Sequence, residues 1–157
     1  DEFNKFSKTN NEFDLLIFGE GDQRNYLLKQ IKKKNLKNRV FLMGHSSKIY
    51  TYMKKADAFI LSSLWEDPGF VLIEAALSNL FIISSNCPNG PKEFLDNGQA
   101  GLLFESNKKN ALNQALQEFC DLKKNLELKK INAKKKLHQL YYVQTQFVFK
   151  KNYLVFL

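Results

Sequence analysis

Short apolar runs alternate with helix-like stretches along most of the chain, and this alternation constrains the fold more than any other feature. The runs expected to form strands are residues 13–18, 39–43, 58–61, 81–83 and 102–104. Apart from Asp14, the first run is continuously apolar, as the others largely are, which is typical of strands buried on both faces of a sheet. We therefore expect an α/β fold with a parallel sheet and helices on both of its faces.

The stretches between these runs carry helical spacing. Expected helices contain residues 26–31, 50–54, 70–77, 111–122 and 126–140, the last being rich in lysine. Asp22 is a candidate cap for the first helix, and Ser46 or Ser47 for the second. We expect one domain over residues 1–140 and a C-terminal extension over residues 141–157, which is aromatic and apolar without a clear period.

The net charge of +8 lies in the C-terminal third of the chain. Residues 1–107 carry 13 basic and 13 acidic side chains, whereas residues 108–157 carry 11 basic and 3 acidic ones. The basic residues are 22 Lys and 2 Arg, which favours solvated helix faces over a nucleic-acid interface. We expect no nucleic-acid partner.

The two cysteines, Cys87 and Cys120, lack metal-ligand spacing and are expected to be reduced. No run of 18 apolar residues predicts a transmembrane helix, and no signal peptide is expected.

Small and polar residues follow four of the expected strands at their carboxyl ends. These stretches are Gly19 to Asp22, Gly44 to Ser46, Ser62 to Glu66, and Ser84 to Pro91. In an open parallel sheet, ligands bind at this edge. A single Gly-x-Gly motif is a weak signal by itself. Four turns of small and polar residues on one edge, however, predict a binding site there.

The most informative stretch begins with the acidic turn Glu66-Asp67-Pro68-Gly69 and continues as a helix from Phe70. A glycine allows the backbone to approach a ligand closely, and a helix start is a favourable diphosphate site. Glu74 lies within this otherwise apolar helix, where a carboxylate is costly unless it is paired. The hydroxyls of a ribose would pair it; a position on the solvent face of the helix is an equal alternative.

Six stretches together resemble the C-terminal, donor-binding half of retaining glycosyltransferases of the GT-B fold (group 1, family 4 type). They are LLIFGEG (15–21), VFLMG (40–44), ADAFILSS (56–63), EDPGFVLIEA (66–75), SNCPNGPKE (85–93) and NGQAGLLF (97–104). Their order and spacing resemble the family from about Leu15 to Leu122, and more narrowly its bacterial surface-glycan group. The resemblance implies that residues 1–140 form a Rossmann-like nucleotide-sugar-binding domain, the C-terminal half of a GT-B fold without its first strand.

The resemblance also implies a role for each matching position. Glu66 would contact the donor sugar near its anomeric carbon as the catalytic residue, and Glu74 would bind the ribose. The donor-binding residues that it implies are Gly19, Gly21, Gly44, His45, Ser63, Gly69, Phe70, Val71 and Glu74, with the amides of Gly69, Phe70 and Val71 holding the diphosphate. For His45 a solvated loop is the alternative to a contact with the base, and for Trp65 a place at the core edge is favoured over a lid beside the sugar. No metal and no cofactor are expected, and the donor substrate is a nucleotide-diphosphate sugar, with a UDP-sugar favoured.

The expected reaction is transfer of a hexose or N-acetylhexosamine to a glycan or lipid-linked acceptor, bound by an N-terminal domain that this chain lacks. The resemblance also implies that the first strand of the donor domain and the Gly-Arg…Lys segment after it are missing from these residues. We therefore expect the isolated chain to have weak or no transferase activity and not to fold readily by itself. One alternative is a non-catalytic nucleotide-sugar-binding fragment, and another is a different GT-B enzyme, such as an epimerase or a phosphorylase. We expect a cytoplasmic protein whose lysine clusters, Lys123-Lys124 and Lys134 to Lys136, could contact the inner face of the cell membrane.

Overall fold

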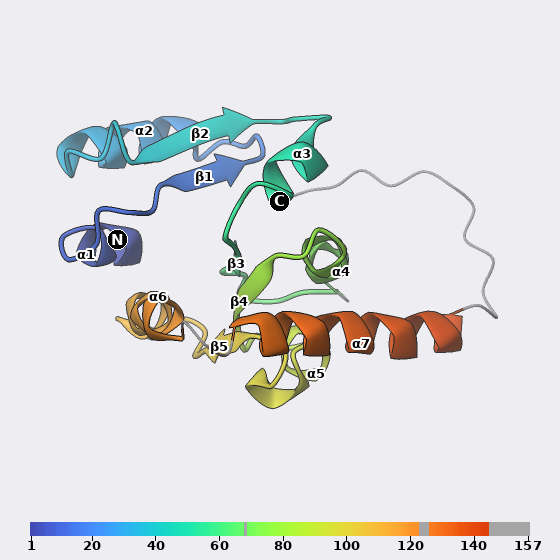
Figure 1. Ribbon diagram of the computed structural model, residues 1–157. Helices are drawn as coiled ribbons and strands as arrows, with labels where there is room; N and C mark the ends of the chain where they lie inside the picture. The colour runs from blue at the N-terminus through green and yellow to red at the C-terminus, as the bar shows by residue number, and fades with distance from the viewer. Residues whose placement is uncertain (68, 123–125, 145–157) are drawn as a thin grey trace. The chain divides into compact units, whose positions relative to one another are not determined.

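The computed structural model describes residues 1–67, 69–122 and 126–144, with side chains described as far as Leu137 (Figure 1). The chain divides into two compact units, the first formed by residues 1–49 and the second beginning at Tyr50. Each unit contains parallel strands connected through helices. The α/β, Rossmann-like class expected from the sequence is therefore confirmed.

The first unit contains α1 (Glu2–Phe6), β1 (Leu15–Phe18), α2 (Arg24–Lys33) and β2 (Val40–Gly44). β1 and β2 pair in parallel, with Leu15 opposite Val40 and Phe18 opposite Gly44. The crossover through α2 makes this a βαβ unit, the usual way of joining two parallel strands.

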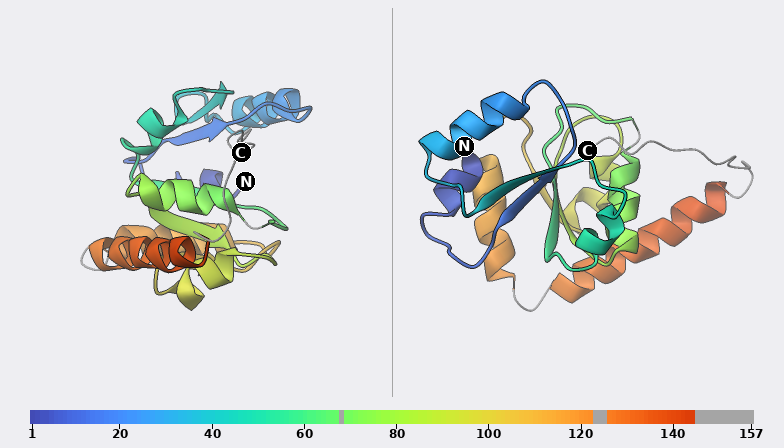
Figure 2. Two further views of the ribbon diagram at one scale, coloured as in Figure 1. Left: turned by 90° about the vertical axis from the view of Figure 1, so that its right-hand side faces the viewer. Right: turned by 90° about the horizontal axis from the view of Figure 1, so that it is seen from above.

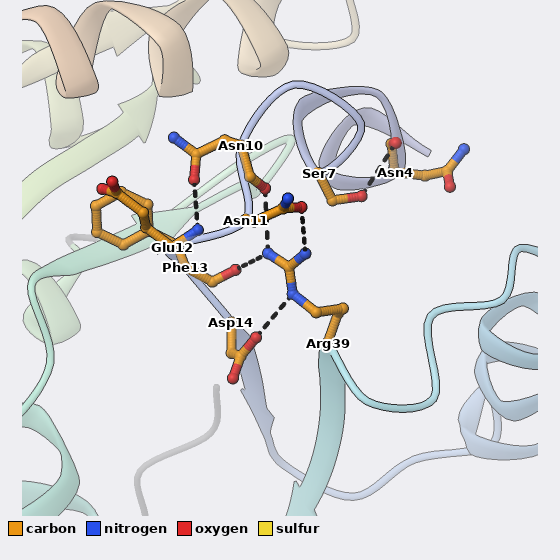
Figure 3. A network of polar contacts seen from close by, with 8 residues as sticks. All are labelled: Asn4, Ser7, Asn10, Asn11, Glu12, Phe13, Asp14 and Arg39. Atoms are coloured by element: carbon orange, nitrogen blue, oxygen red, sulfur yellow. Dashed lines mark hydrogen bonds and ion pairs between the residues drawn. The ribbon is translucent and has the colours of Figure 1, made fainter.

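Arg39 ties together the N-terminal ends of β1 and β2 (Figure 3). Its Nε donates to Asp14 Oδ1 at 2.9 Å, and its Nη2 donates to the carbonyl of Phe13 at 2.6 Å. Further contacts reach the carbonyl of Asn10 at 3.2 Å and Oδ1 of Asn11 at 3.4 Å. The planar guanidinium can donate to several acceptors at once. One side chain therefore provides hydrogen-bond donors for several acceptors in the segment that leads into β1.

The second unit surrounds a three-stranded parallel sheet of order β3–β4–β5. Its elements are α3 (Ile49–Met53, of which Tyr50 onward belongs to this unit), β3 (Ala58–Leu61), α4 (Phe70–Leu77), β4 (Phe81–Ser85), α5 (Pro91–Phe94), the 3₁₀ turn η1 (Asp96–Gly98), β5 (Leu102–Phe104), α6 (Ala111–Asp121) and α7 (Leu126–Gln144). Ala58 is opposite Phe81, and Ile83 is opposite Leu102.

The core of the second unit is built around β4, whose residues Phe81–Ser85 are all buried. Because successive side chains of a strand point to opposite faces, both faces of this central strand are covered. The ring of Phe81 packs on Phe119 of α6 with centroids 5.2 Å apart. Helices α4 and α7 pack against each other (Figure 2), where Leu72 and Ala133 are almost fully buried.

Helix α7 is also fixed to the backbone around η1. Lys129 Nζ donates to the carbonyl of Gly98, and to that of Gly101 at 3.1 Å. Asn132 Nδ2 donates to the carbonyl of Gln99 at 3.2 Å. These side chains satisfy three carbonyls of one turn, so the first half of α7 is anchored by polar contacts as well as by burial.

Several local expectations differ from the structure. Asp22 does not cap α2, because the N-cap position is Gln23 and no side chain caps the helix there. Residues 13 and 14 precede β1 rather than belonging to it; the carbonyl of Phe13 is bound by Arg39, and the ladder begins at Leu15. Within the first unit β1 and β2 form a pair of parallel strands, and within the second unit β3, β4 and β5 form a sheet of parallel strands.

Near the C-terminus, α7 continues to Gln144, past the predicted domain boundary at Leu140. That boundary stays a prediction, and residues 145–157 of the expected extension lie outside the described residues. Among the described residues, no helix combines the length and the apolar character needed to cross a membrane.

Candidate functional site

In the first unit, the carboxyl ends of β1 and β2 bring two predicted site residues together. Gly19 follows β1, and its N–H donates to the carbonyl of Gly44 at 2.9 Å. Gly44 is buried, whereas Gly21 and His45 are exposed in the loops that follow. The exposure of His45 is compatible with both of its predicted readings, a solvated loop and a contact with a nucleotide base.

In the second unit, hydrogen bonds connect the loops that follow β3, β4 and β5. The carbonyl of Ser63 accepts from Ser85 Oγ at 2.6 Å and from Ser106 Oγ at 3.5 Å. Asn86 Oδ1 accepts from the N–H of Ser106 at 2.8 Å. Ser63 is therefore held in place by its carbonyl. The sequence reading missed the roles of Ser85 and Ser106, for which a hydroxyl at a strand end was the available signal.

Gly69 shapes the start of α4. It is the N-cap residue and has φ 73° and ψ 46°, a left-handed conformation that a glycine adopts without a Cβ penalty. The loop before it is fixed where the N–H of Glu66 donates to the carbonyl of Pro88 at 3.3 Å. Glu66 Oε2 lies 3.7 Å from where a Cβ on Gly69 would stand. The carboxylate of Glu66 thus lies beside the helix start that carries Phe70 and Val71.

The start of α4 has the electrostatic character of an anion site. The first-turn N–H groups of an α-helix point out of its N-terminus, and the aligned peptide dipoles give that end a partial positive charge. Phe70 and Val71 occupy this first turn. An anionic group placed there would receive backbone N–H donors and a favourable field.

Glu74 lies one turn further along α4, next to the fully buried Ala75. Its Oε1 accepts a hydrogen bond from the hydroxyl of Tyr50 at 3.0 Å. Its Oε2 is buried and has no hydrogen-bond partner among the described residues. A position on the solvent face of the helix, the alternative left open by the sequence, does not describe this carboxylate.

Tyr50 is a residue that the sequence reading did not select. Burial raises the pKa of its phenol above the usual 10.0, and the hydrogen bond and negative charge of Glu74 raise the pKa further. Tyr50 therefore remains a protonated donor at neutral pH. It is separated from Glu74 by 24 positions, and no local pattern in the sequence could have paired the two residues.

The loop after β3 exposes apolar side chains. Leu64 is 67% exposed, Trp65 is 58% exposed, and Phe70 at the start of α4 is 43% exposed. The expectation that Trp65 packs at the core edge is therefore wrong. The described part of the second unit leaves this side chain largely uncovered, so more than half of its surface faces solvent.

The predicted site residues fall into two groups that belong to different units. Gly19, Gly21, Gly44 and His45 lie in the first unit, and Ser63, Glu66, Gly69, Phe70, Val71 and Glu74 lie in the second. Within the second unit, the structure orders them along one path. This path runs from Glu66, beside the start of α4, to Glu74 one turn into that helix.

The chain matches the family model described as glycosyl transferases group 1 over residues 1–137, and it belongs to this family. An uncharacterized glycosyltransferase of Methanocaldococcus jannaschii is 41% identical over 81 residues, which are 52% of this chain and 20% of the relative. A second relative, from Campylobacter jejuni, is N-acetylgalactosamine-N,N'-diacetylbacillosaminyl-diphospho-undecaprenol 4-alpha-N-acetylgalactosaminyltransferase. It is 29% identical over 116 residues, which are 74% of this chain and 32% of the relative.

Solved structures share the fold at lower identity. A Staphylococcus aureus TarM mutant in complex with fondaparinux, alpha-GlcNAc-glycerol and UDP superposes with a TM-score of 0.84 at 22% identity, covering 92% of this chain and 29% of that chain. Anabaena HepE in complex with UDP-glucose gives a TM-score of 0.79 at 20% identity, covering 92% of this chain and 42% of that chain. The fold is thus that of one part of a GT-B glycosyltransferase, and this chain spans less than half the length of these proteins.

Proposed function

We propose that this chain is the donor-binding part of a retaining glycosyltransferase, which binds a nucleotide-diphosphate sugar for transfer to a glycan or lipid-linked acceptor. The observation that carries the proposal is the Glu74 carboxylate, which has one buried oxygen without a donor and lies one turn beyond a helix start built for an anion. A nucleotide-diphosphate sugar offers an anionic diphosphate with a ribose diol next to it. The diphosphate matches the N-terminus of α4, and the diol matches the carboxylate of Glu74.

In this proposal, the sugar lies at Glu66, the diphosphate at the amides of Gly69, Phe70 and Val71, and the ribose at Glu74. The bond between the anomeric carbon and a diphosphate oxygen breaks, and a bond from that carbon to an acceptor oxygen forms, while the proton of the acceptor hydroxyl passes to the leaving diphosphate. The helix start stabilises the charge that builds up on the leaving diphosphate. Glu66 would act on the sugar side of this bond as the catalytic residue.

The first unit carries further residues that the proposal assigns to donor binding. Gly19 and Gly21 would contact the donor, and Gly44 and His45 would meet the base. Ser63, in the second unit, belongs to the loop that leads to Glu66. Support comes from the structural relatives bound to UDP and UDP-glucose, whose shared fold favours a UDP-sugar as donor. The C. jejuni relative, named as an N-acetylgalactosaminyltransferase, favours an N-acetylhexosamine or a hexose as the transferred sugar.

A contact with a membrane surface remains part of the proposal only through the exposed lysines of α7. Lys129 and Lys130 are engaged by backbone carbonyls and by Glu127, respectively, and Lys136 lies 3.7 Å from Asp96. Lys134 and Lys135 are exposed. Lys123 and Lys124 lie outside the described residues. Two exposed charges supply modest attraction to an anionic lipid surface, on the order of 1 kcal/mol each.

Thermal unfolding in the presence of UDP- and GDP-sugars tests the ribose assignment. We expect one class of nucleotide sugar to raise the Tm of the wild-type protein, and Glu74→Ala to lose most of this shift. Hydrogen bonds to a charged group contribute about 1.5–3 kcal/mol, so the affinity should fall by roughly 10- to 100-fold. Glu93→Ala, a carboxylate on the exposed side of α5, is the matched control. Donor binding that is unchanged in Glu74→Ala would overturn the ribose assignment.

A further inference from the structure

The carboxylate of Glu74 is held by a residue outside the proposed donor-binding set. Tyr50, in the first turn of α3, donates its hydroxyl to Glu74 Oε1 at 3.0 Å. Both residues belong to the second unit. The contact therefore joins two helices at the very side chain on which the ribose assignment depends.

The two oxygens of this carboxylate are in different states. Oε1 is bound to Tyr50, whereas Oε2 is buried without a hydrogen-bond partner among the described residues. An ionised carboxylate can accept about four hydrogen bonds, so the Tyr50 contact leaves lone pairs on both oxygens. A buried acceptor without a donor costs free energy that a ligand hydroxyl would recover. Two neighbouring hydroxyls, one for each oxygen, are the chemistry that fits.

The Tyr50 contact also removes a freedom that would weaken such binding. The last torsion of a glutamate side chain is broad and roughly two-fold, so an untethered carboxylate samples many orientations of its plane. Ordering it on ligand binding would cost side-chain entropy. A hydrogen bond to one oxygen restricts that plane before the ligand arrives.

We infer that Tyr50 is a positioning residue for the donor nucleotide: its hydroxyl fixes the carboxylate plane of Glu74 so that the two oxygens can accept the 2′- and 3′-hydroxyls of the ribose. This inference rests on the proposed function, because it takes Glu74 as the ribose ligand. It assigns to Tyr50 a contribution to nucleotide affinity and to the preference for ribose over deoxyribose.

The surroundings of Tyr50 argue against a role in packing alone. The side chain is 45% exposed, so its ring fills little of the core. α3 is anchored instead by Met53, which is 4% exposed and whose sulfur accepts from Ser78 Oγ at 3.8 Å. Burial is the main cause of the raised pKa of Tyr50, and Glu74 raises this pKa further, so the phenol stays a donor. The hydroxyl, rather than the ring, therefore carries the proposed role.

The test compares Tyr50→Phe with wild type in the full-length protein. Isothermal titration calorimetry would measure the Kd of UDP and GDP and of their 2′-deoxy and 3′-deoxy counterparts. We expect Tyr50→Phe to weaken binding of the ribonucleotide about fivefold, while binding of the deoxy analogues changes less. The ribo-to-deoxy ratio of Kd values does not depend on the fraction of active protein, so a partly unfolded sample cannot mimic this result. Tyr26→Phe, which removes a hydroxyl from an exposed tyrosine of α2, is the matched control.

A double-mutant cycle decides whether Tyr50 acts through Glu74. In a Glu74→Ala background, Tyr50→Phe should have no further effect on the Kd or on the ribo-to-deoxy ratio. A full ribose preference retained in Tyr50→Phe, or an equal loss in Tyr26→Phe, would overturn this inference and leave the proposed function standing. A wild-type protein without any ribose preference, or a preference that survives in Glu74→Ala, would overturn the ribose assignment and this inference with it.

Discussion

At the scale of single residues, Gly69 and Gly101 are glycines for different physical reasons. Gly69 has a left-handed φ of 73°, which sets the direction from which α4 begins. Gly101 is buried just before β5, where a side-chain Cβ would meet the carbonyl oxygen of Ile82 in β4. One position requires a backbone conformation, whereas the other requires the absence of a side chain.

Gly101→Ala is expected to destabilise the second unit. A Cβ at this position would lie 2.6 Å from the carbonyl oxygen of Ile82 and 2.9 Å from Leu95 Cδ2. Because the first contact is with the backbone of β4, the strand pair must shift. We expect a loss of about 1–3 kcal/mol in the free energy of unfolding, measured by urea denaturation. Gly21→Ala, where nothing lies within 4 Å of the new Cβ, is the control and should change stability far less.

At the scale of elements, the pairing of β1 with β2 depends on polar contacts at the ends of the strands. The backbone carbonyl of Arg39 accepts a hydrogen bond from the N–H of Leu15 at 2.8 Å, while the Arg39 side chain binds the segment before β1. Leu16 and Phe41 on these strands are 40% and 39% exposed, so apolar burial within the first unit is incomplete. The Arg39 contacts therefore carry a larger share of the pairing than similar contacts would in a well-buried sheet.

Arg39→Lys tests this dependence. A lysine keeps the charge but lacks the planar fork that reaches the carbonyls of Phe13 and Asn10 together with the Asp14 carboxylate. We expect the free energy of unfolding to fall by about 1 kcal/mol, and the amide of Leu15 to lose hydrogen-exchange protection. Arg24→Lys, at an exposed position in the first turn of α2, is the control. Unchanged protection at Leu15 would show that burial alone holds the strand pair.

At the scale of the whole molecule, the chain covers 20% and 32% of the two glycosyltransferase relatives described above. Transfer requires an acceptor site as well as a donor site. The features of Glu66, the start of α4 and Glu74 account for the donor site only. The proposed function therefore assigns to these 157 residues the binding of a nucleotide sugar. It assigns the complete reaction to a longer protein.

Comparing this 157-residue chain with a longer form of the protein that includes upstream sequence tests that assignment. We expect release of UDP or GDP from nucleotide sugars, measured with a membrane fraction as the source of acceptor, to require the longer form. Glu66→Gln in the longer form should reduce this release while leaving the donor Kd within about threefold, because its contact is with the sugar rather than the nucleotide. Efficient transfer by the 157 residues alone would contradict the assignment.

The sequence predicted the α/β class and most elements because short apolar runs alternate with stretches of helical spacing. Burial on both faces, expected for all the strands, holds for β4 but not for β1 and β2, where Leu16 and Phe41 are exposed. β3 and α4 occupy the residues expected, Ala58–Leu61 and Phe70–Leu77. The expected family is also confirmed, through a match that extends over residues 1–137. The sequence did not predict α5 or η1, since elements of three or four residues leave too little pattern to read.

The sequence by itself determined the order of the strands and of the longer helices along the chain, the family, and the position of Glu74 in an apolar helix. Only the tertiary structure decided how that carboxylate is held, because its partner Tyr50 lies on another helix 24 positions away. It also placed Trp65 in solvent rather than in the core. Periodicity records which face of its own element a residue occupies, whereas a hydrogen bond between two helices depends on how those helices pack.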